Sequence, residues 1–241
     1  MIVQESKRAN LTFVTLSDVG TAHQAFNQPN QDSADFREAD GDFVLAISDG
    51  VGSCKYADRG SKAVIDSCIS TFNTLKARSL CFDSRQVAQN IWTEWQSILA
   101  GENLDDCCAT VKAAFKYGNS ILLVSVGDGF CVFSSESRQI ATESFETTFL
   151  NETDCLNSTF SPECFCCKEI PLKGKPYVVA CCTDGFSNGI EADKELEFVK
   201  ELESRVSASE LRTELESFVN AISKASFDDK SIGVAKYEKQ N

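Results

Sequence analysis

Two apolar segments of this chain end in the same way, and that shared ending is the strongest constraint on its fold. Residues 43–47 and 179–182 are continuous apolar runs, each followed by a small hydroxyl residue and then by Asp-Gly. Runs of this kind are typical of strands buried on both faces. The residues after each pair are not strand-like, so the chain leaves a sheet there. The sequence thus predicts two interior strands that deliver Asp49 and Asp184 to loops, where binding and catalytic groups usually lie.

Helical periodicity and short apolar runs together predict a mixed α and β fold. No internal repeat or linker interrupts the sequence, so we expect one domain spanning residues 1–241. Asp128-Gly129 predicts a hairpin turn between two neighbouring strands. Because the strands are mainly sequential and the helices come in pairs, the pattern favours an α+β layered sandwich over a parallel βαβ fold. The predicted helices are 60–75, 87–99, 194–204 and 211–222, and the predicted strands are 11–16, 43–47, 109–117, 121–126, 130–133, 177–183 and 231–237.

The amino-acid composition limits which binding partners and which cellular compartment we expect. The chain has 23 Lys plus Arg and 36 Asp plus Glu, a net charge of -13, so nucleic acid is not an expected partner. No signal peptide or membrane-spanning stretch is recognisable, which favours a cytoplasmic protein with no membrane partner. The 12 Cys residues are then expected to be free thiols. Four of them lie at positions 155, 164, 166 and 167, but without the C-x-x-C spacing of a zinc site.

The residue inventory excludes several catalytic chemistries. A single histidine, His23, cannot build a metal site of several imidazoles. No Cys is followed six positions later by Arg, the spacing that a cysteine-based phosphatase needs, and glycine-rich nucleotide loops of the usual kind are absent. Any chemistry must therefore rest largely on carboxylates.

Two further aspartates beside predicted strands complete an acidic set. Asp32 and Asp228 join Asp49 and Asp184, and such a cluster needs cations to be stable. Oxygen ligands alone suit Mg²⁺ or Mn²⁺ rather than Zn²⁺. Two such ions about 3.5 to 4 Å apart would hold a bridging water and promote in-line displacement at phosphorus. A plain turn at each Asp-Gly pair remains the alternative.

Five short motifs occur in order along the chain, each at a predicted strand boundary. Together they resemble the motifs of the metal-dependent, type 2C serine/threonine protein phosphatases, and residues 20–23 and 148–153 further resemble a bacterial branch of that family. The resemblance implies a four-layer α-β-β-α sandwich of two mainly antiparallel sheets flanked by helix pairs, with a variable flap-like segment around 141–172. The motifs are Asn30-Gln31-Asp32-Ser33, Asp49-Gly50-Val51-Gly52-Ser53, Val126-Gly127-Asp128-Gly129, Thr183-Asp184-Gly185 and Asp228-Asp229-Lys230-Ser231.

The resemblance also implies metal-binding roles for the matching residues. Asp49 would bridge two ions, Mn²⁺ or Mg²⁺, and the Gly50 carbonyl would help to hold one of them. Asp184 and Asp228 would ligate the other ion. Asp128 matches an acidic position that holds a third, loosely bound ion together with Asp184.

Catalysis would then follow from the same set. Asp32 would orient a metal-bound water and act in catalysis together with Asp49. The implied activity is hydrolysis of phosphoserine and phosphothreonine by the metal-activated water. The implied partners are phosphorylated proteins, either a cognate Ser/Thr kinase or its targets.

Three departures from the family pattern keep other functions open. Gln31 stands where a Glu is frequent, and Val51 stands where some members carry a His. The phosphate-binding Arg just upstream of the first motif is missing. The chain could therefore be a weak or inactive phosphatase-like module that binds phosphoproteins or a kinase. A phosphoesterase for small molecules is a third alternative.

Three basic side chains are candidates to replace the missing arginine. Arg59 is preferred because its planar guanidinium can meet two phosphate oxygens and because it lies ten residues beyond Asp49. Lys55 and His23 are the other candidates. The alternative for each of the three is an ordinary solvated surface residue.

Overall fold

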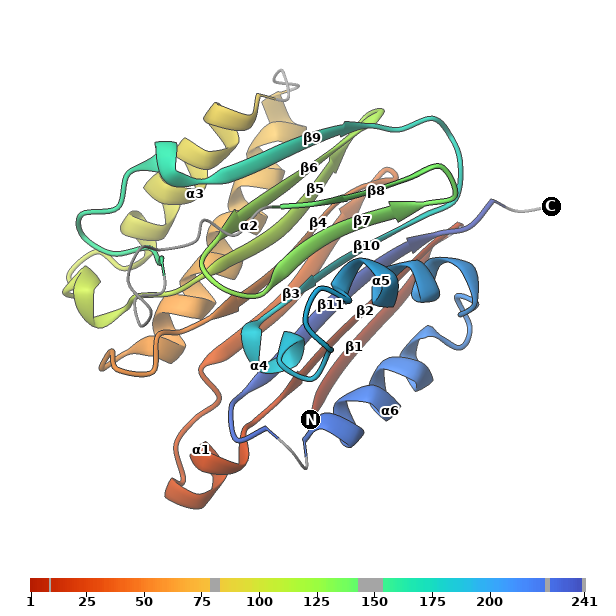
Figure 1. Ribbon diagram of the computed structural model, residues 1–241. Coiled ribbons are helices and arrows are strands. Elements are labelled where there is room, and N and C mark those ends of the chain that lie inside the picture. The colour runs from red at the N-terminus through yellow and green to blue at the C-terminus, as the bar shows by residue number, and fades with distance from the viewer. Residues whose placement is uncertain (9, 79–82, 143–153, 224–225, 240–241) are drawn as a thin grey trace.

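Two antiparallel sheets pack face to face, and helices cover the outer face of each (Figure 1). In spatial order, the six-stranded sheet comprises β1 (Ile2–Arg8), β2 (Leu11–Asp18), β11 (Lys230–Tyr237), β10 (Tyr177–Cys182), β7 (Phe130–Ser135) and β8 (Arg138–Ala141). The five-stranded sheet comprises β3 (Asp32–Ala39), β4 (Asp42–Asp49), β5 (Val111–Tyr117), β6 (Ser120–Val126) and β9 (Cys166–Pro171). This computed structural model describes residues 1–8, 10–78, 83–142, 154–223 and 226–239.

Three apolar cores hold the layers together. Phe13 and Leu45 belong to the core between the two sheets. Trp95 lies in the core that α2 and α3 form against the five-stranded sheet, and Leu215 lies in the core that α4, α5 and α6 form against the six-stranded sheet. These cores confirm the α+β four-layer sandwich. The helices are α1 (Thr21–Phe26), α2 (Ala57–Arg78), α3 (Ser84–Ile98), α4 (Asp184–Ser187), α5 (Glu195–Ser204) and α6 (Leu211–Ile222), with short 3-10 turns η1 (Leu104–Asp106) and η2 (Pro162–Cys164).

Apolar runs in the sequence identify the interior strands but not the edge strands. The seven predicted strands correspond to β2, β4, β5, β6, β7, β10 and β11, all of which have a partner on both sides. The strands without a prediction, β1, β3, β8 and β9, are the edges of the two sheets. An edge strand has solvent along one side, so it needs no continuous apolar run.

The prediction of a hairpin at Asp128-Gly129 is wrong. Strand β6 pairs with β5 and β9 in one sheet, whereas β7 pairs with β10 and β8 in the other. The intervening turn carries the chain from sheet to sheet, with Gly127 and Gly129 at φ values of 80° and 90°. Positive φ is open to glycine at little cost, so two glycines permit this reversal. The strands flanking Asp128 are consecutive but not partners.

The expected flap-like segment around 141–172 is described only in part. Residues 143–153, which include the motif at 148–153, lie outside the described residues. Beyond them, Leu156 forms an isolated β-bridge with Ala109, and β9 completes the edge of the five-stranded sheet. None of the helices in the described ranges is both long and apolar enough to cross a membrane.

Candidate functional site

The ends of β4 and β10 are built alike, as their shared sequence predicts. At β4, the Ser48 hydroxyl donates a hydrogen bond to the Thr110 carbonyl (2.6 Å), and the Asp49 N–H donates to the Thr110 hydroxyl (3.0 Å). At β10, the Thr183 hydroxyl donates to Oδ2 of Asp32 (2.9 Å). The small hydroxyl residue before each Asp therefore ties its strand to a neighbouring segment.

Close approach of other segments explains the glycine in both Asp-Gly pairs. A Cβ atom on Gly50 would collide with the backbone of Ala57 at the start of α2. A Cβ atom on Gly185 would collide with the carbonyl of Asp229. These glycines permit close packing around the two carboxylates. The alternative of a plain turn at each Asp-Gly pair therefore does not explain them.

Aspartates from both sheets gather at one end of the sandwich. Asp32 on β3 lies directly opposite Asp49 on β4 in the strand register, where like charges repel. Burial and the charge of Asp32 raise the pKa of Asp49, and the charges of Asp184 and Asp228 add to the same shift. Burial also raises the pKa of Asp184, with contributions from Asp228 and Asp128. The structure therefore brings together all five predicted carboxylates.

One carboxylate oxygen of Asp32 has a hydrogen-bond partner, and the other has none among the described residues. The residue is 6% exposed, and burial raises the pKa of its carboxyl, although the bond from Thr183 opposes the shift. Oδ2 accepts that bond, whereas Oδ1 is buried and has no hydrogen-bond partner among the described residues. A buried polar atom without a partner is costly, so it marks a position where a ligand would be stabilising.

The donor set suits a hard divalent cation. It consists of carboxylate oxygens and backbone carbonyls, which are the ligands of Mg²⁺ and Mn²⁺. In the described part of the chain, no three His, Cys, Asp or Glu side chains already form a group able to hold one ion. The fit to such ions therefore rests on the chemistry of the oxygen donors and on the mutual repulsion of the carboxylates.

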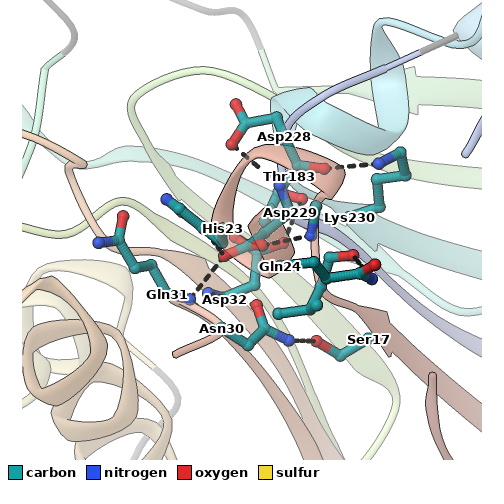
Figure 2. Close-up of polar contacts among 12 residues, drawn as sticks. Ser17, His23, Gln24, Asn30, Gln31, Asp32, Thr183, Asp228, Asp229 and Lys230 are labelled. Carbon is teal, nitrogen blue, oxygen red and sulfur yellow. Dashed lines mark hydrogen bonds and ion pairs between the residues drawn. The ribbon is translucent and has the colours of Figure 1, made fainter. Parts of the chain in front are cut away.

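A sixth aspartate, absent from the predicted site, organises this end of the sandwich. Asp229 is 2% exposed and accepts hydrogen bonds from the backbone N–H groups of Gly20 and Gln31, each at 2.6 Å. Its Oδ2 also lies 2.9 Å from Nδ1 of His23 (Figure 2). The only signal in the sequence was the second Asp of the pair at 228–229.

Asp229 is linked through one residue, Gln31, to the loop after β4. The Gln31 N–H donates to Asp229, and the Gln31 carbonyl accepts from the N–H of Gly50 at 3.1 Å. The start of β3 is thereby held between the start of β11 and the Asp49-Gly50 pair. This chain of bonds positions the backbone N–H of Gly50, the residue whose carbonyl is one of the predicted ligands.

Two buried lysines fix the turns that carry the other aspartates. Lys112 is 1% exposed and donates to the Gly127 carbonyl at 2.5 Å, directly before Asp128. Lys230 is also 1% exposed and donates to the Asp228 carbonyl at 2.5 Å. Burial lowers the pKa of Lys112. Both lysines bind backbone oxygens, so they hold loop geometry; Lys230 lies within the fifth motif, whereas no motif includes Lys112.

Comparison with family models decides which family has this arrangement. The model described as Protein phosphatase 2C matches residues 19–220. The chain belongs to the protein phosphatase 2C family. A comparison of the sequence with the curated proteins finds no significant match.

Solved structures of the phosphatase 2C fold align over nearly the whole chain. RsbX in complex with magnesium is 13% identical, with a TM-score of 0.67 and coverage of 98% of this chain and 100% of that chain. The catalytic domain of the serine threonine protein phosphatase PstP, in complex with 2 manganese ions, is 17% identical (TM-score 0.68; 95% and 99% covered). Serine/threonine phosphatase Stp1 from Staphylococcus aureus is 15% identical (TM-score 0.65; 97% and 96% covered). At these identities the likeness shows the shared fold.

In this phosphatase 2C chain the three candidate phosphate anchors are placed differently. Arg59 forms an ion pair with Glu102 (2.6 Å) and lies over the Tyr56 ring, and Lys55 lies over the same ring. Within the described residues neither cation contacts a carboxylate of the acidic set. His23 alone among the three contacts that region, through Asp229.

The four cysteines near the flap do not gather in the phosphatase 2C fold. The sulfur of Cys155 accepts from the side-chain amide of Asn157. Cys164 is exposed in η2, and Cys166 and Cys167 are successive residues of β9. Successive strand residues point to opposite faces of a sheet, so this arrangement separates their sulfurs.

Proposed function

We propose that this chain is a metal-dependent protein phosphatase that hydrolyses phosphoserine and phosphothreonine. The observation that supports it is the gathering of Asp49 from one sheet with Asp184 and Asp228 from the other. Carboxylates crowded in this way are costly unless cations neutralise them. Membership of the phosphatase 2C family supplies the reaction class.

The cofactors we propose are two Mn²⁺ or Mg²⁺ ions, with a third held more loosely. Asp49 and the Gly50 carbonyl would hold one ion, Asp49 with Asp184 and Asp228 the second, and Asp184 with Asp128 the third. The manganese in the PstP structure and the magnesium in the RsbX structure support this choice of metal. When bound, such ions supply Lewis-acid activation of water and neutralise phosphate charge.

The protein side chains would position the reactants. Oδ2 of Asp32 is fixed by Thr183, so Oδ1 is free to accept a hydrogen bond from the attacking water. His23 is the anchor we now prefer for phosphate, because it lies at the acidic end whereas Arg59 is paired with Glu102. The proposed partners are phosphorylated proteins, including a cognate Ser/Thr kinase or its targets.

The test is metal-dependent hydrolysis of a phosphoserine and a phosphothreonine peptide. Protein stripped with EDTA should be inactive and should recover with Mn²⁺ or Mg²⁺, whereas Asp49→Asn should not recover. Asp66→Asn, on the exposed face of α2, serves as the control and should behave as the unmodified chain. Binding of the phosphopeptides without any turnover would instead favour the phosphatase-like binding module.

A further inference from the structure

Three cysteines outside the acidic set lie where three distant segments of the chain meet. Cys54 follows β4, Cys108 lies shortly before β5, and Cys155 lies beyond β8. All three are free thiols. The proposed phosphatase function uses none of them, so their proximity needs a separate explanation.

Backbone pairing brings the three segments together. Ala109 forms an isolated β-bridge with Gly50 on one side and with Leu156 on the other. The N–H of Val51 donates to the Cys108 carbonyl at 2.9 Å, and the N–H of Leu156 donates to the Ala109 carbonyl at 2.9 Å. The cysteines are therefore held close by the fold rather than by a chance contact of surface side chains.

The thiols of Cys54 and Cys108 share one acceptor. Each sulfur donates to the Asp105 carbonyl at 3.3 Å. The Cys108 sulfur also lies 4.0 Å from the Leu104 carbonyl, one residue before Asp105. A shared acceptor keeps the two sulfurs in the same neighbourhood, so side-chain rotation is the movement that would bring them together.

We propose that Cys54 and Cys108 form a reversible disulfide, which makes this pair a redox modification site beside the acidic set. The proposal goes beyond the phosphatase function and does not depend on it. The oxidant is a low-molecular-weight disulfide, RSSR. Disulfides that form between otherwise reduced thiols are usually transient.

The difference in solvent exposure between Cys54 and Cys108 indicates which thiol reacts first. Cys54 is partly exposed, so its thiolate attacks RSSR, forms a mixed disulfide and releases one RSH. Cys108 is buried against it and then attacks the Cys54 sulfur, which forms the protein disulfide and releases the second RSH. The two protein thiols lose two electrons and two protons, and one RSSR becomes two RSH. Burial raises the pKa of Cys108, which agrees with Cys54 as the thiol that meets RSSR first.

The disulfide would join the loop after Asp49 to the start of β5. That loop already rests on Cys108 through the Val51 hydrogen bond. A covalent link four residues beyond Gly50 would therefore restrain the backbone that carries a proposed metal ligand.

The experiment is disulfide mapping of the full chain after incubation with oxidised glutathione. Remaining thiols are blocked with iodoacetamide, and the non-reduced digest is examined by mass spectrometry. We expect a Cys54–Cys108 linked peptide that disappears with dithiothreitol. Alkylation of both cysteines after oxidation, or linkage of either one to another cysteine such as Cys155, would overturn the assigned pair.

Two variants make the result specific. Cys54→Ser keeps a donor for the Asp105 carbonyl, so it should fold, as circular dichroism can verify, and it should lose the linked peptide completely. Cys164→Ser, at an exposed cysteine outside the trio, is the matched control and should keep the linkage. Loss of the linkage in Cys164→Ser would contradict the assignment. No readout involves phosphatase activity, so failure here is separate from failure of the proposed function.

Discussion

A single buried carboxylate carries much of the geometry at the acidic end. Asp229 accepts from two backbone N–H groups and contacts His23, so it joins α1, β3 and β11 (Figure 2). It is not one of the predicted ligands, yet it sits directly after Asp228 and beneath Gly185. Its role is to position the residues around it.

Replacing Asp229 should therefore reduce stability strongly. Asp229→Ala leaves the N–H groups of Gly20 and Gln31 without an acceptor, and each such group costs about 1 to 3 kcal/mol. We expect the free energy of unfolding, measured by urea titration of EDTA-treated protein, to fall by at least about 2 kcal/mol. Asp66→Ala, in an exposed position of α2, should change it by less than about 0.5 kcal/mol. Equal effects of the two substitutions would contradict this role.

At the scale of elements, the start of α2 is packed directly onto the end of β4. Gly50 permits this contact, because any Cβ there would meet the Ala57 backbone. Gly52, two residues on, has room, since its Cβ would come no nearer than 3.4 Å to the Gln31 side chain. The two glycines of one loop therefore differ in what they allow.

Alanine at these two positions should separate packing from loop flexibility. Gly50→Ala should destabilise the protein by about 1 to 3 kcal/mol, the usual cost of overpacking, and should weaken Mn²⁺ binding because β4 and α2 must separate. Gly52→Ala should leave both properties close to those of the unmodified chain. Urea unfolding and isothermal titration calorimetry with Mn²⁺ measure the two effects. Comparable losses in both variants would show that the contact with Ala57 is not the cause.

A second junction between elements lies at the far end of the sandwich. Asp42, at the start of β4, accepts from Lys76 of α2 (3.0 Å), from Lys116 of β5 (2.9 Å) and from the N–H of Gly118 (2.9 Å). Burial opposes ionisation of Asp42, but the bonds from Lys116 and Lys76 outweigh it and lower its pKa below the usual 3.8. A carboxyl with a lowered pKa in the folded state stabilises the fold while it is ionised.

The contribution of Asp42 should disappear only in acid. It is fully present above the unfolded pKa of 3.8 and is lost as the pH falls through the lower folded pKa. Asp42→Asn should cost about 1.5 to 3 kcal/mol at pH 7, and the difference from the unmodified chain should shrink below pH 3.8. Urea unfolding from pH 7 down to pH 2.5 measures it. Asp40→Asn, whose side chain is 88% exposed, is the control and should show no such difference at any pH.

At the scale of the whole molecule, the acidic set places carboxylates of both sheets close together. Asp49 ends β4 of one sheet, while Asp184 and Asp228 flank β10 and β11 of the other. Without cations these carboxylates repel across the interface. A bound ion would replace that repulsion by attraction between the sheets.

Divalent ions should therefore stabilise the entire fold. With Mn²⁺ at about 100 times its Kd, the gain is about 2.7 kcal/mol, or a rise in Tm of about 5 to 10 °C. Asp49→Asn should lose this rise, and its metal-free form should melt higher than the metal-free unmodified chain because one repelling charge is gone. Differential scanning calorimetry with Mn²⁺ or EDTA measures both shifts. A normal Mn²⁺ response in Asp49→Asn would refute its role as the bridging ligand.

Much of the fold could be predicted because its signals are local. An interior strand is buried on both faces, so its residues are apolar without interruption. The runs that precede Asp49 and Asp184 can therefore be recognised from consecutive residues alone. The helix periodicity over α2, α3, α5 and α6 is local in the same way. The single domain over 1–241 stays a prediction.

The sequence by itself determined the interior strands, the helix pairs and the aspartates at strand ends, because each depends on neighbours a few residues away. Only the tertiary structure decided that the Asp128 turn crosses between sheets, that Arg59 pairs with Glu102, and that Cys54 and Cys108 share the Asp105 carbonyl. It also decided that Asp229 binds residues about two hundred positions earlier in the chain. Such contacts follow from how layers stack and strands are ordered, and one-dimensional patterns carry no record of that order.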